Sequence, residues 1–149
     1  MVQEINFNEI LPIWKNNLWP DRKSPIEPVT SMKYLGGYDL ALKEFKPIFL
    51  AIKDNDKIVG VNSGVKTSQS LFRSRGLWVD PEYRGKNFGV MLLEETIKIA
   101  KEQKLLYVWS VPRVTALNTY LKAGFKKTSD FFDEKMEFGP NCYVLKNLD

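Results

Sequence analysis

The sequence predicts a mixed α/β fold of the α+β kind, with an antiparallel meander, a helix-linked parallel crossover and flanking helices. Three β-rich runs between residues 47 and 79 are separated by short turn sequences, which is typical of a meander. An amphipathic stretch and then an apolar run follow them, and strand, helix and strand in succession indicate a parallel crossover. With 149 residues, of which 44% are hydrophobic, the chain fits a single domain over residues 1–149.

The N-terminal part predicts a strand and a helix ahead of an irregular connection. Residues Val2–Phe7 alternate as a strand does, and Glu9–Leu18 shows a short helical pattern despite Pro12 near its start. Three prolines mark residues 20–31 as irregular, because proline fixes φ and lacks an N–H donor. After this connection, Tyr34–Phe45 predicts another helix.

The meander begins with a predicted hairpin. Residues Pro47–Lys53 and Lys57–Lys66 are apolar and β-rich, and Asp54-Asn55-Asp56 between them suits a tight turn. Residues Ser70–Val79 then run back through the polar turn Thr67-Ser68-Gln69. We therefore expect three antiparallel strands in sequence order.

The clearest helix in the sequence spans Asn87–Gln103, where the apolar period becomes helical. Its predicted buried stripe consists of Val90, Leu93, Ile97 and Ala100. Residues Leu105–Val111 follow as a nearly continuous apolar run, which predicts a strand buried on both faces.

The C-terminal part predicts a short helix and two late strands. The helix covers Val114–Lys122 and ends at Gly124, which suits a left-handed cap with Phe125 packing back on the last turn. The late strands are expected over Phe125–Phe132 and Cys142–Lys146, on either side of a polar and aromatic loop.

Composition excludes several classes of function. The chain has no histidine and only one cysteine, which excludes a disulfide within the chain, a Cys/His zinc site and nucleophiles activated by histidine. We expect no metal site, and we interpret Cys142 as a small buried hydrophobe. The chain has neither a basic, apolar start nor a long apolar run, so we expect a cytoplasmic protein without a membrane partner. The net charge of +4 is spread among acidic residues, so we expect no nucleic-acid partner.

Residues 80 to 89 are the segment that points to chemistry, because they place a strand end, a basic turn and a helix start in succession. The first turn of a helix presents N–H groups without intrahelical partners and a partial positive charge, which favours a bound phosphate. Gly85 and Gly89 let a ligand approach the backbone, and Arg84 and Lys86 add charge. The chain lacks both GxxxxGK[ST] and the GxGxxG spacing, which argues against ATP and NAD.

Two motifs in this order resemble the GNAT superfamily of N-acetyltransferases. The first is similar to that family's [RQ]xxGx[GA] pyrophosphate loop, which Arg84 and Gly89 match and in which Asn87 replaces the usual glycine. The second is similar to its AxxxYxxxGF helix and cap. The matching residues are Ala116, Tyr120, Gly124 and Phe125.

The resemblance implies a GNAT-like mixed sheet and an acyltransferase that moves an acetyl group from acetyl-CoA to a primary amine by direct attack. Tyr120 is then the catalytic acid that protonates the departing coenzyme A sulfur, although a tyrosine on this helix face also suits a core position. The residues implied in cofactor binding are Leu77, Trp78, Val79, Arg84, Gly85, Lys86, Asn87, Phe88 and Gly89. The implied acceptor is a small-molecule or peptide amine, and a homodimer is compatible with the sequence. The alternative is a non-catalytic acyl-CoA sensor or interaction module.

Several polar and aromatic residues keep two interpretations at this stage. Arg113 stands where relatives commonly have an asparagine, so it could meet a phosphate instead. Glu27 and Asp39 are weak candidates for a general base. Strand alternation places Arg73 and Arg75 on the face of Leu71 and Leu77, opposite Phe72 and Trp78. Both arginines could line a site for an anionic substrate group or meet solvent, and solvent is the favoured environment. The aromatic residues that could line an acceptor pocket or pack in the core are Trp14, Trp19, Tyr34 and Tyr38.

Overall fold

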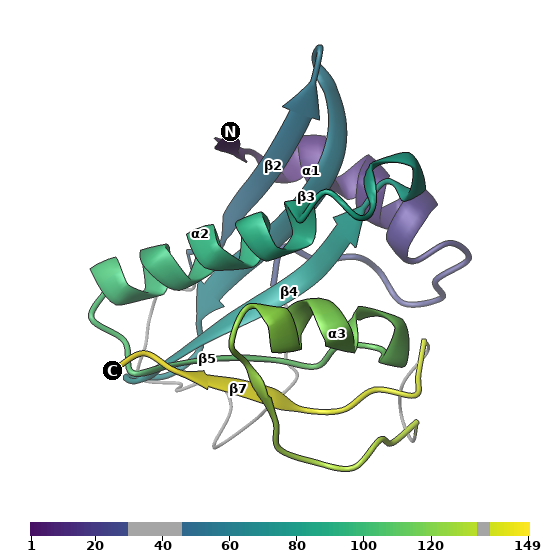
Figure 1. The fold of residues 1–149 in the computed structure, drawn as a ribbon. Coiled ribbons are helices and arrows are strands. Elements are labelled where there is room, and N and C mark those ends of the chain that lie inside the picture. The colour runs from purple at the N-terminus through teal and green to yellow at the C-terminus, as the bar shows by residue number, and fades with distance from the viewer. Residues whose placement is uncertain (30–45, 134–137) are drawn as a thin grey trace.

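The computed structural model describes residues 1–29, 46–133 and 138–149 and contains a seven-stranded mixed sheet in the order β1-β2-β3-β4-β5-β7-β6 (Figure 1). The strands are β1 Val2–Ile5, β2 Ile48–Asp54, β3 Lys57–Lys66, β4 Leu71–Val79, β5 Tyr107–Ser110, β6 Lys126–Lys127 and β7 Val144–Asn147. The helices are α1 Phe7–Ile13, the π-helical turn η1 Trp14–Leu18, the 3₁₀ turn η2 Pro81–Tyr83, α2 Phe88–Glu102 and α3 Val114–Lys122. The helix predicted for Tyr34–Phe45 lies outside the described residues.

The predicted meander is confirmed. Strands β1 to β4 pair antiparallel with their sequence neighbours. In the turn between β2 and β3, Asn55 and Asp56 have φ values of 48° and 70°. Positive φ at both central positions is the requirement of the tight hairpin turn that asparagine and aspartate favour.

The predicted parallel crossover is also confirmed. Strand β5 pairs parallel with β4, beginning at Leu71 opposite Tyr107 and ending at Arg73 opposite Trp109. Strand β7 then pairs antiparallel with both β5 and β6. The first late strand is shorter than predicted, because only Lys126–Lys127 joins the ladder and an isolated bridge between Phe132 and Asn141 continues the pairing irregularly.

The N-terminal helix begins with a reciprocal cap. The Glu9 backbone N–H donates to Asn6 Oδ1 at 3.0 Å, and the Asn6 N–H donates to Glu9 Oε1 at 3.3 Å, which satisfies two donors that a helix start leaves unpaired. The predicted span to Leu18 is confirmed, but its last residues form the π-helical turn η1. This turn buries Trp14 completely.

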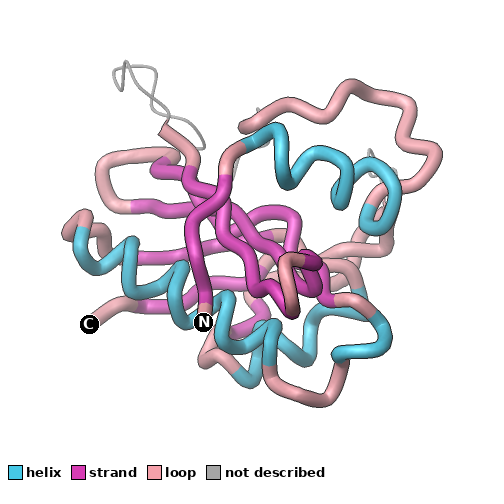
Figure 2. The backbone as a smooth tube through the Cα atoms, turned by 90° about the horizontal axis from the view of Figure 1, so that it is seen from above, coloured by secondary structure: helices cyan, strands magenta, loops and turns pink. Residues whose placement is uncertain are grey.

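Helices cover both faces of the sheet (Figures 1 and 2). Helices α2 and α3 pack on one face, over a core of Phe72, Leu93, Ile97, Val108, Tyr120, Cys142 and Val144. Helix α1 and η1 pack on the other face, over Phe49, Ala51, Val61 and Trp78. Cys142 is fully buried, as expected of a small hydrophobe. Within the described residues, no helix has the length and apolarity that a membrane span needs.

The end of α3 forms the cap that the sequence predicts. Gly124 has a φ of 94°, its N–H donates to Leu121 O, and the Phe125 N–H donates to Tyr120 O, each at 3.0 Å. This double pattern is a Schellman motif. The Phe125 ring lies edge-on to the Tyr120 ring, with 5.0 Å between centroids. The cap therefore fixes the position of Tyr120.

Strand β4 contains a bulge that the alternation of the sequence does not reveal. Its partner residues on β3 change from Val61 opposite Trp78 to Ser63 opposite Arg75, so β4 has one extra residue in this interval. Gly76 lies in this interval with a φ of 79°, a conformation that favours glycine.

Because of the bulge, the prediction of which sheet face each residue of β4 occupies is partly wrong. Leu77 packs against the core under α2, on the side of Phe72, while Trp78 packs against the core under α1. Strict alternation would have put Leu77 on the face of Arg73 and Arg75. The predicted solvent environment of these arginines is also wrong, since they are only 7% and 5% exposed.

Candidate functional site

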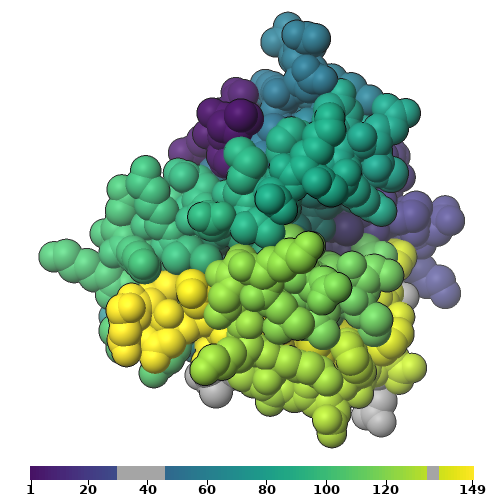
Figure 3. All heavy atoms as spheres, viewed as in Figure 1, coloured from purple at the N-terminus to yellow at the C-terminus, as the bar shows by residue number. Residues whose placement is uncertain are grey.

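A cavity of about 870 Å³ opens between β4, the loop that follows it, the start of α2 and the helix α3, and it extends to η1. Figure 3 shows the surface hollowed where the teal atoms of the loop after β4 face the green atoms of α3. This volume is in the range of small-molecule sites in proteins, which is roughly 300–1,000 Å³.

The cavity exists because β4 and β5 part. Their pairing ends at Arg73 and Trp109, whereas β4 continues to Val79. The last residues of β4, Leu77–Val79, line the cavity. A strand edge without a neighbouring strand presents backbone donors and acceptors that an extended ligand can bind as an added strand.

The loop after β4 brings predicted phosphate-binding residues to this cavity. Arg84 lines it and donates from Nε to Val79 O at 3.1 Å, which holds the loop against the strand end. Gly85 has a φ of 84°, and a Cβ built there would meet no other described atom within 4 Å. The backbone at Gly85 is therefore open to a ligand.

The backbone conformation of Asn87 explains how the loop accommodates a residue other than glycine at this position. Its φ and ψ are 63° and 18°, in the left-handed region. Asparagine enters this region more readily than most other residues, so the backbone shape of the loop is retained. The first intrahelical bond of α2 runs from the Met91 N–H to Asn87 O at 3.0 Å. The N–H groups of Phe88, Gly89 and Val90 precede it and are not used by the helix.

Gly89 has a packing role that the sequence does not reveal. A Cβ at this position would lie 2.7 Å from Cγ2 of Thr119, a distance that real Cβ atoms do not show. Glycine is therefore needed here for the close approach of α2 to α3. Both Gly89 and Thr119 line the cavity, so this contact also shapes it.

Lys86 is the one predicted cofactor residue outside the described lining of the cavity. It is exposed, and its ammonium group lies 5.2 Å from the centroid of the Tyr83 ring.

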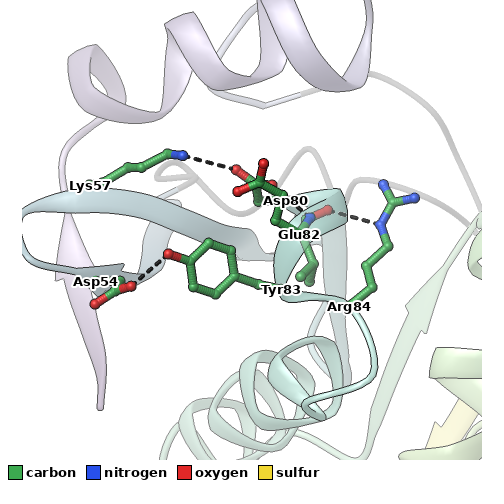
Figure 4. A network of polar contacts seen from close by, with 7 residues as sticks. Asp54, Lys57, Asp80, Glu82, Tyr83 and Arg84 are labelled. Atoms are coloured by element: carbon green, nitrogen blue, oxygen red, sulfur yellow. Dashed lines mark hydrogen bonds and ion pairs between the residues drawn. The ribbon is translucent and has the colours of Figure 1, made fainter.

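The loop after β4 is attached to the β2–β3 hairpin (Figure 4). The Tyr83 hydroxyl donates to Asp54 Oδ2 at 2.6 Å, and the hydrogen bond to this carboxylate is the main cause of the raised pKa of Tyr83. Lys57 Nζ lies 3.4 Å from Asp80 Oδ2, and the Glu82 N–H donates to Asp80 Oδ1 at 2.9 Å. These contacts position the loop from the side away from α3.

Tyr120 lies at the inner end of the cavity. It is only 2% exposed, yet it lines the cavity from α3. Its hydroxyl lies 2.9 Å from the Ser74 hydroxyl and 3.0 Å from the Ser110 hydroxyl. Burial raises the pKa of Tyr120 above its ordinary value, and the bonds to Ser110 and Ser74 oppose this shift. The phenol therefore keeps its proton at neutral pH.

A buried polar network continues from Tyr120 into the core. Asn62 donates from Nδ2 to Ser74 Oγ and to Thr96 Oγ1, both at 2.9 Å. The Ser110 hydroxyl donates to Ser74 O at 2.7 Å. The sequence does not mark these serine, threonine and asparagine residues, because isolated polar residues within apolar runs give no signal of their own.

The cavity is also lined by two arginines of β4, Arg73 and Arg75. Arg73 lies over the Trp109 ring, and Arg75 lies over the Trp14 and Trp19 rings, with 5.0 to 5.1 Å between guanidinium carbon and ring centroid. Of the two tryptophans, Trp14 is a core residue and Trp19 lines the cavity. The cavity-lining residues in the described part of the chain include no aspartate or glutamate.

The structure does not bring the weak base candidates into the described lining. Glu27 is exposed, and its backbone carbonyl, rather than its carboxylate, accepts a bond from Arg75 Nη1 at 2.7 Å. Asp39 lies outside the described residues, as do Tyr34 and Tyr38. A search of the described residues found no metal-binding group of three or more His, Cys, Asp or Glu side chains.

Comparison with solved structures supports the fold. The chain is similar to an acetyltransferase of the GNAT family from Staphylococcus aureus Mu50, with a TM-score of 0.69 at 20% identity, covering 100% of this chain and 99% of that one. It is similar to an aminoglycoside 6'-N-acetyltransferase complexed with coenzyme A, with a TM-score of 0.61 at 14% identity over 69% and 73% of the two chains. The PaiA N-acetyltransferase of Thermoplasma acidophilum, in complex with coenzyme A, matches with a TM-score of 0.57 at 23% identity over 68% and 60%.

A match to a family sequence model identifies the family of the chain. No curated protein matches the chain significantly. A sequence model described as "Acetyltransferase (GNAT) domain" matches residues 46–127, which is more than half of the 149 residues. This span includes the meander, the loop after β4, helix α2 and the helix that carries Tyr120. The chain belongs to the GNAT family, and it is an N-acetyltransferase.

Proposed function

We propose that the protein transfers an acetyl group from acetyl-CoA to a primary amine by direct attack, with Tyr120 as the catalytic acid. The observation that carries this proposal is the position of the Tyr120 hydroxyl, which lies beside the gap between β4 and β5 in the same cavity as the loop after β4. The open backbone at Gly85 and the free N–H groups at the start of α2 suit a diphosphate.

The described residues would hold the cofactor along one continuous path. The edge of β4 at Leu77–Val79 would bind the extended pantetheine arm through its backbone. The residues of the loop, from Arg84 through Gly89, would bind the pyrophosphate, and Arg84 adds a positive charge there. When bound, acetyl-CoA supplies a thioester whose carbonyl carbon an amine can attack.

The proposed transfer balances in bonds and in protons. The N–C bond forms at the acceptor amine as the C–S bond breaks, and Tyr120 Oη donates its proton to the departing sulfur. The surplus proton of the amine leaves to water, because no described carboxylate lines the cavity. Tyr120 regains a proton through the neighbouring Ser74 or Ser110 hydroxyl.

The burial of Tyr120 favours this role. A buried phenol resists ionisation, so Tyr120 stays protonated across the pH range in which a free amine can attack. The hydrogen bonds to Ser74 and Ser110 hold its hydroxyl in one position, which an acid catalyst needs.

The test is release of free thiol from acetyl-CoA in the presence of a panel of amines. Tyr120→Phe should lower turnover by about 10²-fold or more, while the rise in melting temperature that coenzyme A produces remains. Tyr107→Phe is the matched control, since Tyr107 packs in the cluster around Trp109 and does not line the cavity. Equal rates for the parent protein and Tyr120→Phe would remove Tyr120 from the mechanism.

A cytoplasmic location, a single domain over residues 1–149 and a homodimer remain predictions from the sequence.

A further inference from the structure

Three arginines converge on the dipeptide Leu18-Trp19 at the end of η1. The guanidinium carbons of Arg22 and Arg75 lie 4.8 and 5.1 Å from the Trp19 ring centroid. Arg113 donates from Nη2 to the Leu18 carbonyl. All five residues line the cavity. The arginines come from segments far apart in the sequence, so the fold gathers these charges on one wall.

This gathering of like charges favours a bound anion. Among the described residues, neither Arg22 nor Arg113 forms an ion pair with a carboxylate. Arg113 is half-buried, so its charge is partly removed from water, and this burial lowers its pKa. An arginine remains charged at neutral pH even so. A negatively charged group in the cavity would relieve both the repulsion and the lost solvation.

A buried amide anchors the chain beside this wall. Asn141 is 5% exposed, lines the cavity and forms an antiparallel bridge with Arg113. Its Nδ2 donates to Val111 O at 2.8 Å, which fixes the orientation of the amide, and its Oδ1 has no hydrogen-bond partner. Asn141 Oδ1 lies beside Gly139 and is closed off from solvent. The amide therefore fixes the backbone beside Arg113.

We propose that the acetyl acceptor is a small amine that also has a carboxylate or a phosphate, held through its anion by Arg113 and Arg22. This inference rests on the proposed function, since it assigns the acceptor of the same reaction. The Trp19 and Phe138 rings stack with Arg22 and Arg113. They hold the guanidinium groups in place before the acceptor arrives.

The same wall disfavours polycationic acceptors. A polyamine would place ammonium groups against these arginines, and the described lining offers no carboxylate to compensate them. The cavity should therefore discriminate by charge, because like charges brought together in a partly buried site repel strongly.

The experiment compares acceptors that differ only in the anion. Acetylation by the parent protein is measured, as free thiol released, for α-amino acids against their amides and for phosphoethanolamine against ethanolamine. Spermidine represents the polycations. The expected result is a kcat/KM about tenfold or more higher for the anionic member of one of these pairs, which is the strength of a hydrogen bond to a charged group. The pair that shows it identifies the anion as carboxylate or phosphate.

Variants then assign the effect to residues. Arg113→Gln should lower the preference for the anionic member about tenfold and leave the KM for acetyl-CoA unchanged, and Arg22→Gln is a second variant should Arg113→Gln not fold. Lys98→Gln removes the same charge from the exposed face of α2 and should leave the preference intact. The ratio between two acceptors is unaffected by a change in the folded fraction, so a merely structural role would not alter it.

Three outcomes would overturn the inference. The first is turnover of neutral amines or spermidine at least equal to that of every anionic amine. The second is a preference that survives both arginine substitutions. The third is a raised KM for acetyl-CoA in Arg113→Gln, which would assign the arginine to the cofactor. Failure of the proposed function looks different, because no amine of any charge would then release thiol.

Discussion

The indole N–H of Trp14 donates to the backbone carbonyl of Gly76 at 2.9 Å, joining the π-helical turn to the bulge of β4. The ring also lies directly over the glycine, because a Cβ on Gly76 would come within 2.4 Å of the indole. The position of η1, and with it the wall formed by Leu18 and Trp19, depends on this contact.

Replacing Gly76 should therefore destabilise the protein through two separate effects. Gly76 and Gly85 have similar φ values of 79° and 84°, but only Gly76 has a neighbour that a Cβ would strike. Gly85→Ala should cost about 1 kcal/mol for the backbone alone, whereas Gly76→Ala should cost about 1–3 kcal/mol more from the clash. Denaturant unfolding of both variants measures the difference. Equal losses would show that the indole moves aside freely.

The left-handed backbone of Asn87 predicts that glycine is tolerated at this position. Asn87→Gly should preserve the melting temperature and its rise with coenzyme A, because glycine adopts the left-handed conformation without strain. Asn87→Val should cost about 1–2 kcal/mol and weaken coenzyme A binding, since the loop must deform. Thermal melts with and without coenzyme A check both results. A valine variant with unchanged binding would contradict this account of the loop.

The contact between Gly89 and Thr119 can be tested by a double-mutant cycle. Gly89→Ala should destabilise the protein, because its new Cβ would meet Thr119 Cγ2 at 2.7 Å. Thr119→Ser removes that methyl group and should recover most of the loss when both changes are combined. Additive losses would mean that the alanine acts on something other than Thr119.

The burial of Tyr120 predicts the pH dependence of stability. The pKa of Tyr120 is raised in the folded protein, so the fold favours the protonated form. Its contribution to stability is fully present below the unfolded pKa of about 10. It is lost as the pH rises through the folded pKa. Melting temperatures between pH 8 and 11 should fall more steeply for the parent protein than for Tyr120→Phe. Parallel curves would indicate that Tyr120 ionises as easily in the fold as outside it.

Features encoded within a short segment could be predicted from the sequence. The hairpin turn at Asn55 and Asp56, the span of α3 and its cap at Gly124 depend on residues near one another in the chain. The backbone of the loop after β4 belongs to the same class, because Gly85 and Asn87 adopt the positive φ that glycine and asparagine favour. Local backbone preferences determine such elements, and contacts with distant segments alter them little.

Features that depend on contacts between distant segments could not be predicted. The bulge at Gly76 exists because Trp14, far away in the sequence, packs on that glycine. The burial of Arg75 follows from the same contact, since its guanidinium stacks on Trp14 and Trp19. The hydrogen bonds of Tyr120 to Ser74 and Ser110 join three elements, and no spacing in the sequence indicates them.

The bond between Tyr83 and Asp54 has a consequence for the kinetics of cofactor capture. It fastens the loop after β4 to the β2–β3 hairpin. In the proposed function this loop binds the diphosphate, and a loop held by such a contact pays little ordering entropy on binding. Association of the acyl donor should then proceed as a simple encounter, with a rate governed by diffusion and charge attraction rather than by a preceding rearrangement of the protein.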